Sequence, residues 1–396
     1  MKKLKVRNEV FGKTIFNPNN FEHLFLTNNE FDNLHHGEDF TLFDNIPYME
    51  NKYILYSPIR VYIDLTLLCN LRCVTCVNNS ANALTDELSI QDFISVLDGL
   101  KKDSVFDIRF TGGELTFRKD WDKILEKAKD LDFTFSINTN GVFNDKTIDK
   151  LIKIMPDEIT VSLDGYAQTN DIIRGKGVFN TAISSIKKLK NNNCRVTINC
   201  ALTKYCTNQD IDSLLNFAND FCDDISFFHA RPIGRASNLK TDLLNFYELS
   251  NIMGLIESKK NLYPNLKVRT RSSSLKSNSI TSKNAETYNL QQGGTDGFTR
   301  FNIMSNGDLY AGGCVPYVSD SFKESLKLGN IIKEEYSLLN IWRNSEKLTE
   351  VRAYSSKLQE RCNSCSEYKK NCHGFTMEME YYRQNSKLNK NPFCIY

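Results

Sequence analysis

Residues 60–76 read RVYIDLTLLCNLRCVTC. The first part, Arg60 to Thr66, is rich in β-branched and aromatic residues, which predicts a β-strand. The second part is a Cys-x3-Cys-x2-Cys triplet formed by Cys69, Cys73 and Cys76. Three closely spaced thiolates can bind three irons of a [4Fe-4S] cubane and leave the fourth iron open to a small molecule. The stretch therefore predicts a strand that leads directly into a catalytic iron–sulfur cluster.

Other roles for the triplet fit less well. A structural zinc site takes four protein ligands, and this run supplies three. A disulfide framework belongs to an oxidising compartment, whereas the chain starts without a secretory signal. Ordinary burial remains an alternative for the triplet, and it is our expectation for the cysteines without ligand-like spacing, which are Cys194, Cys200, Cys206 and Cys222.

Strand-like and helix-like segments alternate from residue 58 to about residue 240. The predicted strands are Arg60 to Thr66, Asp107 to Thr111, Phe133 to Asn138, Glu158 to Leu163, Arg195 to Leu202 and Ile225 to Arg231. Helical patterns lie between them at Ser89 to Lys101, Trp121 to Asp130, Lys146 to Ile154, Val178 to Asn191 and Gln209 to Phe221. This order predicts an α/β fold with a parallel sheet, specifically a partial (β/α)6 barrel, because a full barrel needs eight units.

Polar and glycine-rich residues follow the predicted strands. In parallel α/β sheets, ligands bind at the carboxyl ends of the strands, so these residues are expected to share one pocket. They are Gly112, Gly113 and Glu114 after the second strand, Asn138 at the end of the third, Ser162 near the end of the fourth, Asn199 in the fifth and Arg231 at the end of the sixth.

The sequences on either side of this alternating region predict three further structural units. Residues 1–57 contain a hairpin around Asn17 to Asn20 and a short helix from Asn28, and an exposed hairpin edge can accept a peptide strand. Residues 241–300 read as a helical and loop connector, with a polar stretch from Arg269 to Thr299 that suits a cover. Residues 301–396 begin with a hairpin around Asn306 and Gly307 and continue into a cysteine-rich module.

Composition limits the classes of partner. Fifty basic and 48 acidic side chains among 396 residues give a formal charge of +2, so no strong field attracts nucleic acid or anionic lipid. No apolar run is long enough to span a bilayer. We therefore expect a cytoplasmic protein with neither a nucleic-acid nor a membrane partner.

With these motifs in register, residues 58 to 235 resemble the radical S-adenosylmethionine (SAM) superfamily. The resemblance implies a [4Fe-4S] cluster on Cys69, Cys73 and Cys76 whose open iron binds SAM, and reductive cleavage of SAM to a 5′-deoxyadenosyl radical. It also implies three sets of SAM contacts. Gly112, Gly113 and Glu114 would hold the amino group, and Ser162 and Arg174 would hold the ribose and the carboxylate. Asn138, Asn199 and Arg231 would line the pocket. The chain departs from the family at Thr75, where an aromatic residue or histidine is usual.

The C-terminal cysteines resemble the SPASM extension of that superfamily. The match implies one auxiliary [4Fe-4S] cluster on Cys362, Cys365, Cys372 and Cys394, in place of the usual two. Taken alone, the segment also fits a zinc knuckle. The roles open to Cys314 are a cluster ligand in place of Cys394, a catalytic thiol that donates hydrogen, or a residue without function.

SPASM-type members most often modify peptides. The resemblance therefore implies hydrogen abstraction from a residue of a ribosomally made precursor peptide, leading to a crosslink, an epimerised centre or an oxidised side chain. A flavodoxin- or ferredoxin-type protein is the expected electron donor, and residues 1–57 are the expected leader-peptide recognition element. Two alternatives remain at this point: a radical SAM dehydrogenase or rearrangement enzyme that acts on a small metabolite, and a non-catalytic metal-binding protein.

Overall fold

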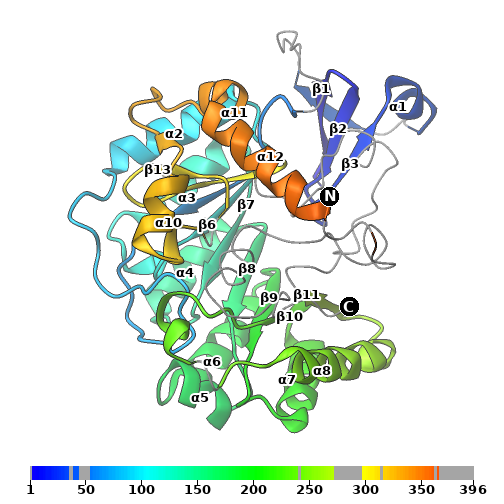
Figure 1. Cartoon of the computed structure of the whole chain (residues 1–396). Helices are drawn as coiled ribbons and strands as arrows, with labels where there is room; N and C mark the ends of the chain where they lie inside the picture. The colour runs from blue at the N-terminus through cyan, green and yellow to red at the C-terminus, as the bar shows by residue number, and fades with distance from the viewer. Residues whose placement is uncertain are drawn as a thin grey trace.

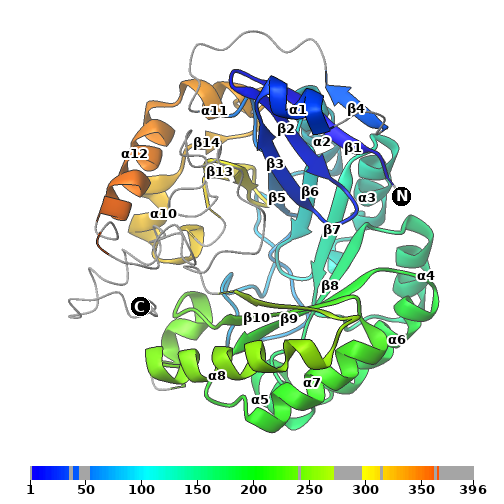
Figure 2. The same cartoon turned by 90° about the vertical axis from the view of Figure 1, so that its right-hand side faces the viewer.

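The computed structural model describes residues 2–34, 39–43, 54–239, 242–271, 297–312, 315–360 and 364. Its centre is a ten-stranded sheet with the order β11-β10-β9-β8-β7-β6-β5-β12-β13-β14, and Figure 2 shows how it curves from β5 round to β10. The strands are β5 (Arg60–Asp64), β6 (Asp107–Thr111), β7 (Thr134–Thr139), β8 (Glu158–Ser162), β9 (Val196–Leu202), β10 (Asp224–His229), β11 (Lys267–Arg271), β12 (Arg300–Ile303), β13 (Asp308–Tyr310) and β14 (Gly329–Asn330). From β11 to β12 all neighbouring strands are parallel.

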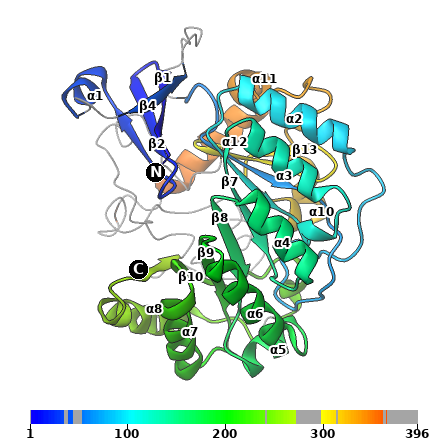
Figure 3. The same ribbon diagram turned by 180° about the vertical axis from the view of Figure 1, so that it is seen from behind.

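Helices cover the convex face of this sheet, as Figures 1 and 3 show. They are α2 (Ile90–Lys102), α3 (Trp121–Asp130), α4 (Asp145–Ile154), α6 (Val178–Asn191) and α7 (Asn208–Phe221). Short α5 (Gln168–Arg174) precedes α6, and α8 (Phe246–Lys259) precedes β11. The predicted partial (β/α)6 barrel is confirmed. Within the described residues, no helix is both long and apolar enough to cross a membrane.

The two faces of the sheet differ in polarity because side chains alternate along each strand. Val61 and Ile63 of β5 are fully buried in the core against the helices. Tyr62 and Asp64 lie on the other, concave face, where the register continues with Arg109 and Thr111 of β6. The strands therefore present an apolar outer face and a polar inner face.

The sheet extends beyond the six predicted strands at both edges. Strand β11 pairs with β10, although its last residues, from Arg269, fall in the stretch predicted as a loop. The predicted C-terminal hairpin is confirmed as β12 and β13, and β12 pairs with β5 as a continuation of the barrel sheet. Polar residues facing the inside of the barrel make β11 resemble a loop in sequence.

The C-terminal part then packs back on the barrel. Its helices are α10 (Asp320–Leu326), α11 (Leu339–Asn344) and α12 (Glu346–Glu360). Trp342 of α11 is fully buried and its indole nitrogen donates to the carbonyl oxygen of Leu55 at 2.7 Å. Residues 313–314, 361–363 and 365–396 lie outside the described residues, and so do Cys314, Cys362, Cys365, Cys372 and Cys394.

The N-terminal residues form a separate four-stranded sheet of order β3-β2-β1-β4. It contains β1 (Leu4–Glu9), β2 (Gly12–Asn17), β3 (Glu22–Leu26) and β4 (Phe40–Phe43), with α1 (Asn28–Leu34) after β3. The predicted hairpin and helix are confirmed, whereas β1 and β4 were not predicted. Strand β1 alternates basic and apolar residues. Arg7 in this strand is fully buried, and its guanidinium group donates to Ser57 and to the carbonyl oxygen of Ser104.

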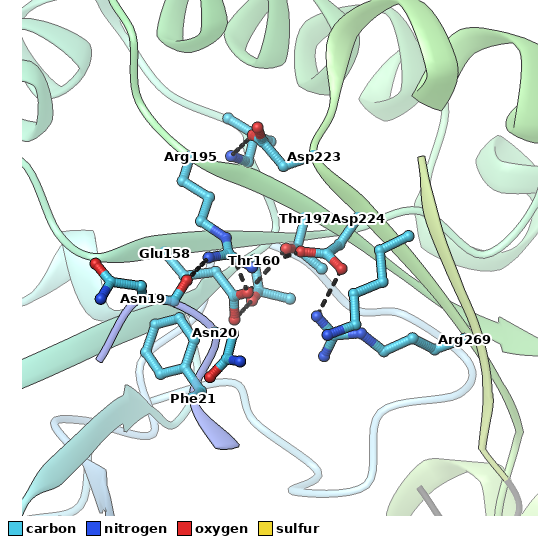
Figure 4. Close-up of polar contacts among 12 residues, drawn as sticks. Asn19, Asn20, Phe21, Glu158, Thr160, Arg195, Thr197, Asp223, Asp224 and Arg269 are labelled. Carbon is cyan, nitrogen blue, oxygen red and sulfur yellow. Dashed lines mark hydrogen bonds and ion pairs between the residues drawn. The ribbon is translucent and has the colours of Figure 1, made fainter. Parts of the chain in front are cut away.

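The turn between β2 and β3 places Asn19 and Phe21 beside Arg195 at the amino-terminal end of the barrel (Figure 4). The ring of Phe21 lies 5.1 Å from the guanidinium carbon of Arg109 and 5.5 Å from that of Arg195. Arg195 also donates to the carbonyl oxygen of Asn19. The two sheets are thus joined by a specific contact.

A belt of alternating charges surrounds this contact, and each acidic side chain in it bridges two arginines. Asp107 pairs with Arg60 and Arg109, Glu158 with Arg109 and Arg195, and Asp224 with Arg195 and Arg269. The belt compensates the charges that face the inside of the barrel at this end.

Candidate functional site

The cysteine loop leaves the opposite, carboxyl end of β5. Cys73 is buried, Cys69 and Cys76 are partly exposed, and all three thiols are free. The backbone nitrogen of Cys69 donates to the carbonyl oxygen of Ala81 at 3.1 Å, which closes the loop. Burial raises the pKa of the Cys73 thiol, Arg174 opposes that effect, and the neighbouring Asp164, Cys76 and Cys69 add to it. The Cys73 thiol is therefore the most enclosed of the three.

The three thiols suit a cluster better than a single ion. Nowhere in the described part of the chain do three His, Cys, Asp or Glu side chains form a group that could hold one metal ion. A cubane has a different requirement, because each thiolate binds its own iron. Three free thiols on one short loop, two of them partly exposed, meet that requirement.

Gly112 and Gly113 lie where β6 ends and meets the cysteine loop. A β-carbon on Gly112, whose φ is +122°, would lie 2.4 Å from the carbonyl oxygen of Thr66. A β-carbon on Gly113 would lie 2.3 Å from that of Leu68. The nitrogen of Gly113 donates to Thr66 at 2.7 Å, so the glycines allow a close backbone contact that seats the loop.

Glu114 is fully buried and joins three segments of the site. Its backbone nitrogen donates to Leu68, and its carboxylate accepts from the Thr139 hydroxyl and from the backbone nitrogen of Asn140 at 2.8 Å. Burial raises its pKa, and these hydrogen bonds oppose the shift. Asn140 in turn donates to the side chain of Asn70 in the cysteine loop. The sequence pointed to Asn138 at this strand end and missed Thr139 and Asn140.

Arg174, at the end of α5, lies beside Asp164 and beside Cys73, a candidate cluster ligand. Its guanidinium group is 2.8 Å from the carboxylate of Asp164, and Nη1 lies 4.0 Å from the sulfur of Cys73. Thr75 donates to the same carboxylate at 3.3 Å. Asp164 directly follows the predicted fourth strand, which ends at Leu163, but its role could not be read from the sequence.

Arg235 was also missed as a site residue. Its side chain donates to the carbonyl oxygens of Cys73 and Ser80, each at 2.8 Å, and its backbone nitrogen donates to Cys76 at 3.0 Å. A β-carbon on the preceding Gly234 would lie 2.4 Å from the carbonyl oxygen of Cys76. The segment that follows β10 therefore holds the cysteine loop in place through these hydrogen bonds and this close backbone contact.

The remaining predicted residues lie along the concave face or at its rim. Ser162 and Asn199 are register partners on β8 and β9, and both are partly exposed, as is Asn138 of β7. Arg231 follows the end of β10 and is also partly exposed. The expected burial of the four remaining cysteines, Cys194, Cys200, Cys206 and Cys222, is confirmed.

Family models match two regions of the chain. The model of the radical SAM superfamily matches residues 63–218, and the SPASM model, described as an iron–sulfur cluster-binding domain, matches residues 295–366. The first region contains the cysteine triplet and strands β6 to β9. The second contains Cys314, Cys362 and Cys365.

Individual proteins are similar over most of the chain. Mycofactocin maturase MftC of Mycolicibacterium smegmatis is 28% identical over 356 residues, which are 86% of this chain and 83% of that protein. SuiB of Streptococcus suis, solved with S-adenosylmethionine, superposes with a TM-score of 0.70 at 19% identity, covering 89% of this chain and 90% of SuiB. Native anSMEcpe with bound AdoMet gives 0.65 at 19% identity, covering 85% and 94%. At these identities the two solved structures show a shared fold.

Proposed function

The chain belongs to the radical SAM superfamily and carries a SPASM-type iron–sulfur domain, and from this premise we propose that it is a maturase of a ribosomally made precursor peptide. It would abstract a hydrogen atom from one residue of that peptide. The observation that carries the proposal is the seating of the cysteine loop at the carboxyl end of a partial barrel, against Glu114, Arg174 and Arg235.

The residues of the site have three proposed roles, and Glu114 is assigned to two of them. Cys69, Cys73 and Cys76 would hold the [4Fe-4S] cluster, which with SAM supplies reductive cleavage to a 5′-deoxyadenosyl radical. Glu114 and Arg235, whose hydrogen bonds are internal to the protein, would fix the loop that carries the ligands. The SAM-lining assignments on the neighbouring strand ends are Gly112, Gly113, Glu114, Asn138, Ser162, Arg174, Asn199 and Arg231.

The second cluster is assigned to the C-terminal cysteines. Cys362, Cys365, Cys372 and Cys394 would close one cubane, which suits electron transfer or support because no iron is left open. The SPASM model matches residues 295–366 and so supports an iron–sulfur role for Cys362 and Cys365. Cys372 and Cys394 are proposed from the resemblance in cysteine spacing. A flavodoxin- or ferredoxin-type protein would supply the electron for SAM cleavage.

A peptide substrate is supported by the relatives. MftC is named as a maturase, and SuiB has also been solved bound to its precursor peptide SuiA, with a TM-score of 0.69 to this chain. The N-terminal sheet offers a place for a leader segment, because β3 pairs with β2 alone among the described strands. Its other edge would accept a peptide strand through main-chain hydrogen bonds. The product would be a crosslink, an epimerised residue or an oxidised side chain, and Cys314 is the proposed hydrogen donor for epimerisation.

The test is anaerobic turnover with dithionite, SAM and a synthetic peptide encoded by a short reading frame next to the gene. We expect 5′-deoxyadenosine and a peptide whose mass or stereochemistry has changed. Cys69→Ala should abolish both products, whereas Cys222→Ala, at a buried cysteine outside the site, should retain them.

Two outcomes would contradict the proposal. Formation of 5′-deoxyadenosine with every such peptide left unchanged, together with turnover of a small metabolite, would favour the metabolite enzyme. Absence of 5′-deoxyadenosine from cluster-loaded protein under all conditions would favour a non-catalytic iron–sulfur protein.

A further inference from the structure

The carboxylate of Asp164 is held by donors from three different parts of the barrel. Its side chain is 1% exposed. One oxygen, Oδ1, accepts from the backbone nitrogen of Ala201 in β9 at 2.8 Å. The other, Oδ2, accepts from Thr75 in the cysteine loop at 3.3 Å and pairs with Arg174 of α5 at 2.8 Å. This carboxylate is therefore fixed in position and is shared between the barrel and the cysteine loop.

Arg174 connects that carboxylate to Cys73. Its side chain is 12% exposed, and one of its terminal nitrogens lies 4.0 Å from the Cys73 sulfur. The backbone gives a second connection, because the nitrogen of Val74 donates to the carbonyl oxygen of Ile173 at 2.9 Å. The cation is thus held beside the thiol by a hydrogen bond in the main chain and by an ion pair in the side chain.

Thr75 links the cysteine loop to the carboxylate of Asp164. It lies between Cys73 and Cys76, is 8% exposed, and occupies the position at which the chain departs from the usual aromatic residue or histidine. Its hydroxyl group donates to Asp164, whereas a phenylalanine ring has no donor and a histidine would donate through a ring nitrogen. Thr75 therefore ties the ligand loop to the acid through a neutral hydroxyl group.

We propose that the charges of Arg174 and Asp164 together set the reduction potential of the cluster that Cys69, Cys73 and Cys76 would hold, with Arg174 raising it and Asp164 lowering it. Adding an electron to the cluster makes its charge more negative. A guanidinium group beside a ligand sulfur favours the reduced state, and a buried carboxylate next to it opposes that effect and holds the guanidinium group in place. The inference rests on the proposed assignment of the triplet as cluster ligands.

The test is a redox titration of reconstituted holoenzyme followed by electron paramagnetic resonance. The signal to follow is the one that changes when SAM is added, since it belongs to the cluster with the open iron. Asp164→Asn removes a negative charge and should raise the midpoint potential. Arg174→Gln removes a positive charge and should lower it. Thr75→Val changes no charge and should shift the potential less than either variant.

A matched control is the ion pair at the other end of the barrel between buried Asp224 and partly exposed Arg269, which lie 2.6 Å apart. Asp224→Asn should leave the midpoint potential unchanged even if it lowers stability. Shifts of the same sign for Asp164→Asn and Arg174→Gln, or shifts no larger than that of the control, would overturn the proposal.

A second comparison decides the case in which Asp164→Asn fails to bind iron. Arg174→Lys keeps the charge and should restore a potential near that of the wild type, whereas a potential equal to that of Arg174→Gln would overturn the inference. The titration uses no peptide. A protein that binds the cluster but modifies no peptide would therefore still show these shifts, which separates failure of this inference from failure of the proposed function.

Discussion

The ring of Phe21 lies against the guanidinium group of Arg109, with 5.1 Å between ring centre and guanidinium carbon, and so joins the N-terminal sheet to the barrel. Phe21 is 9% exposed, and Arg195 lies on the same ring. An element proposed to recognise the leader peptide is therefore attached to the barrel by a buried aromatic side chain in addition to the connecting chain.

Phe21→Ala should lower the free energy of unfolding by about 3 kcal/mol, the usual cost of truncating a buried aromatic side chain. Chemical unfolding of the anaerobically purified protein measures this effect. Phe117→Ala, at a side chain that is 47% exposed, should cost much less. Equal effects of the two changes would show that Phe21 does not join the two sheets.

Gly113→Ala should displace the cysteine loop and reduce the iron bound there, because the added methyl group would lie 2.3 Å from the carbonyl oxygen of Leu68. Iron analysis after reconstitution measures the loss. Gly254→Ala is the control, since a β-carbon there meets nothing within 4 Å and the residue lies inside helix α8. It should retain iron and stabilise the helix by up to about 1 kcal/mol. Full iron content in Gly113→Ala would contradict the loop-seating role.

Asp64 should make stability depend on pH. Burial raises its pKa to about 6, partly offset by the Tyr317 hydroxyl group, which donates to its carboxylate. The folded protein then binds more protons than the unfolded chain between about pH 4 and pH 6, so stability falls as the pH rises through that window. Asp64→Asn should remove this dependence and stabilise the protein above pH 6 by on the order of 2–3 kcal/mol.

Thermal unfolding of anaerobically purified protein at about pH 5 and about pH 7.5 measures the effect of Asp64. The gain of Asp64→Asn over the wild type should be larger at the higher pH. Tyr317→Phe should act in the opposite direction there, because it leaves the buried carboxylate without its donor. The same gain at both pH values would show that Asp64 titrates normally.

Iron content should separate the two proposed clusters. Two cubanes predict about eight irons per chain, and loss of either should leave about four. Cys69→Ala and Cys362→Ala should therefore each halve the iron, whereas Cys222→Ala should not change it. About twelve irons in the wild type would instead mean that Cys314 and further residues build a third cluster.

Much of the fold was predictable because its signals are local. The six central strands and the helices between them follow from alternating and helical periodicities within each segment. Strands β1 and β11 were missed because their charged residues resemble surface residues in sequence. In the structure Arg7 is buried against Ser57 and Arg269 pairs with Asp224, and both partners are distant in the sequence.

The sequence by itself determined the spacing of Cys69, Cys73 and Cys76 and their place directly after a strand, because a few neighbouring residues encode both. Only the tertiary structure decided that Arg174 lies between Asp164 and Cys73, and that Arg235 holds the carbonyl oxygen of Cys73, 162 residues away in the chain. Such contacts depend on the register of the strands and on the curvature of the sheet, which bring distant segments together at the carboxyl end of the barrel. The ligand candidates are thus a property of local sequence, and the charges around them are a property of the fold.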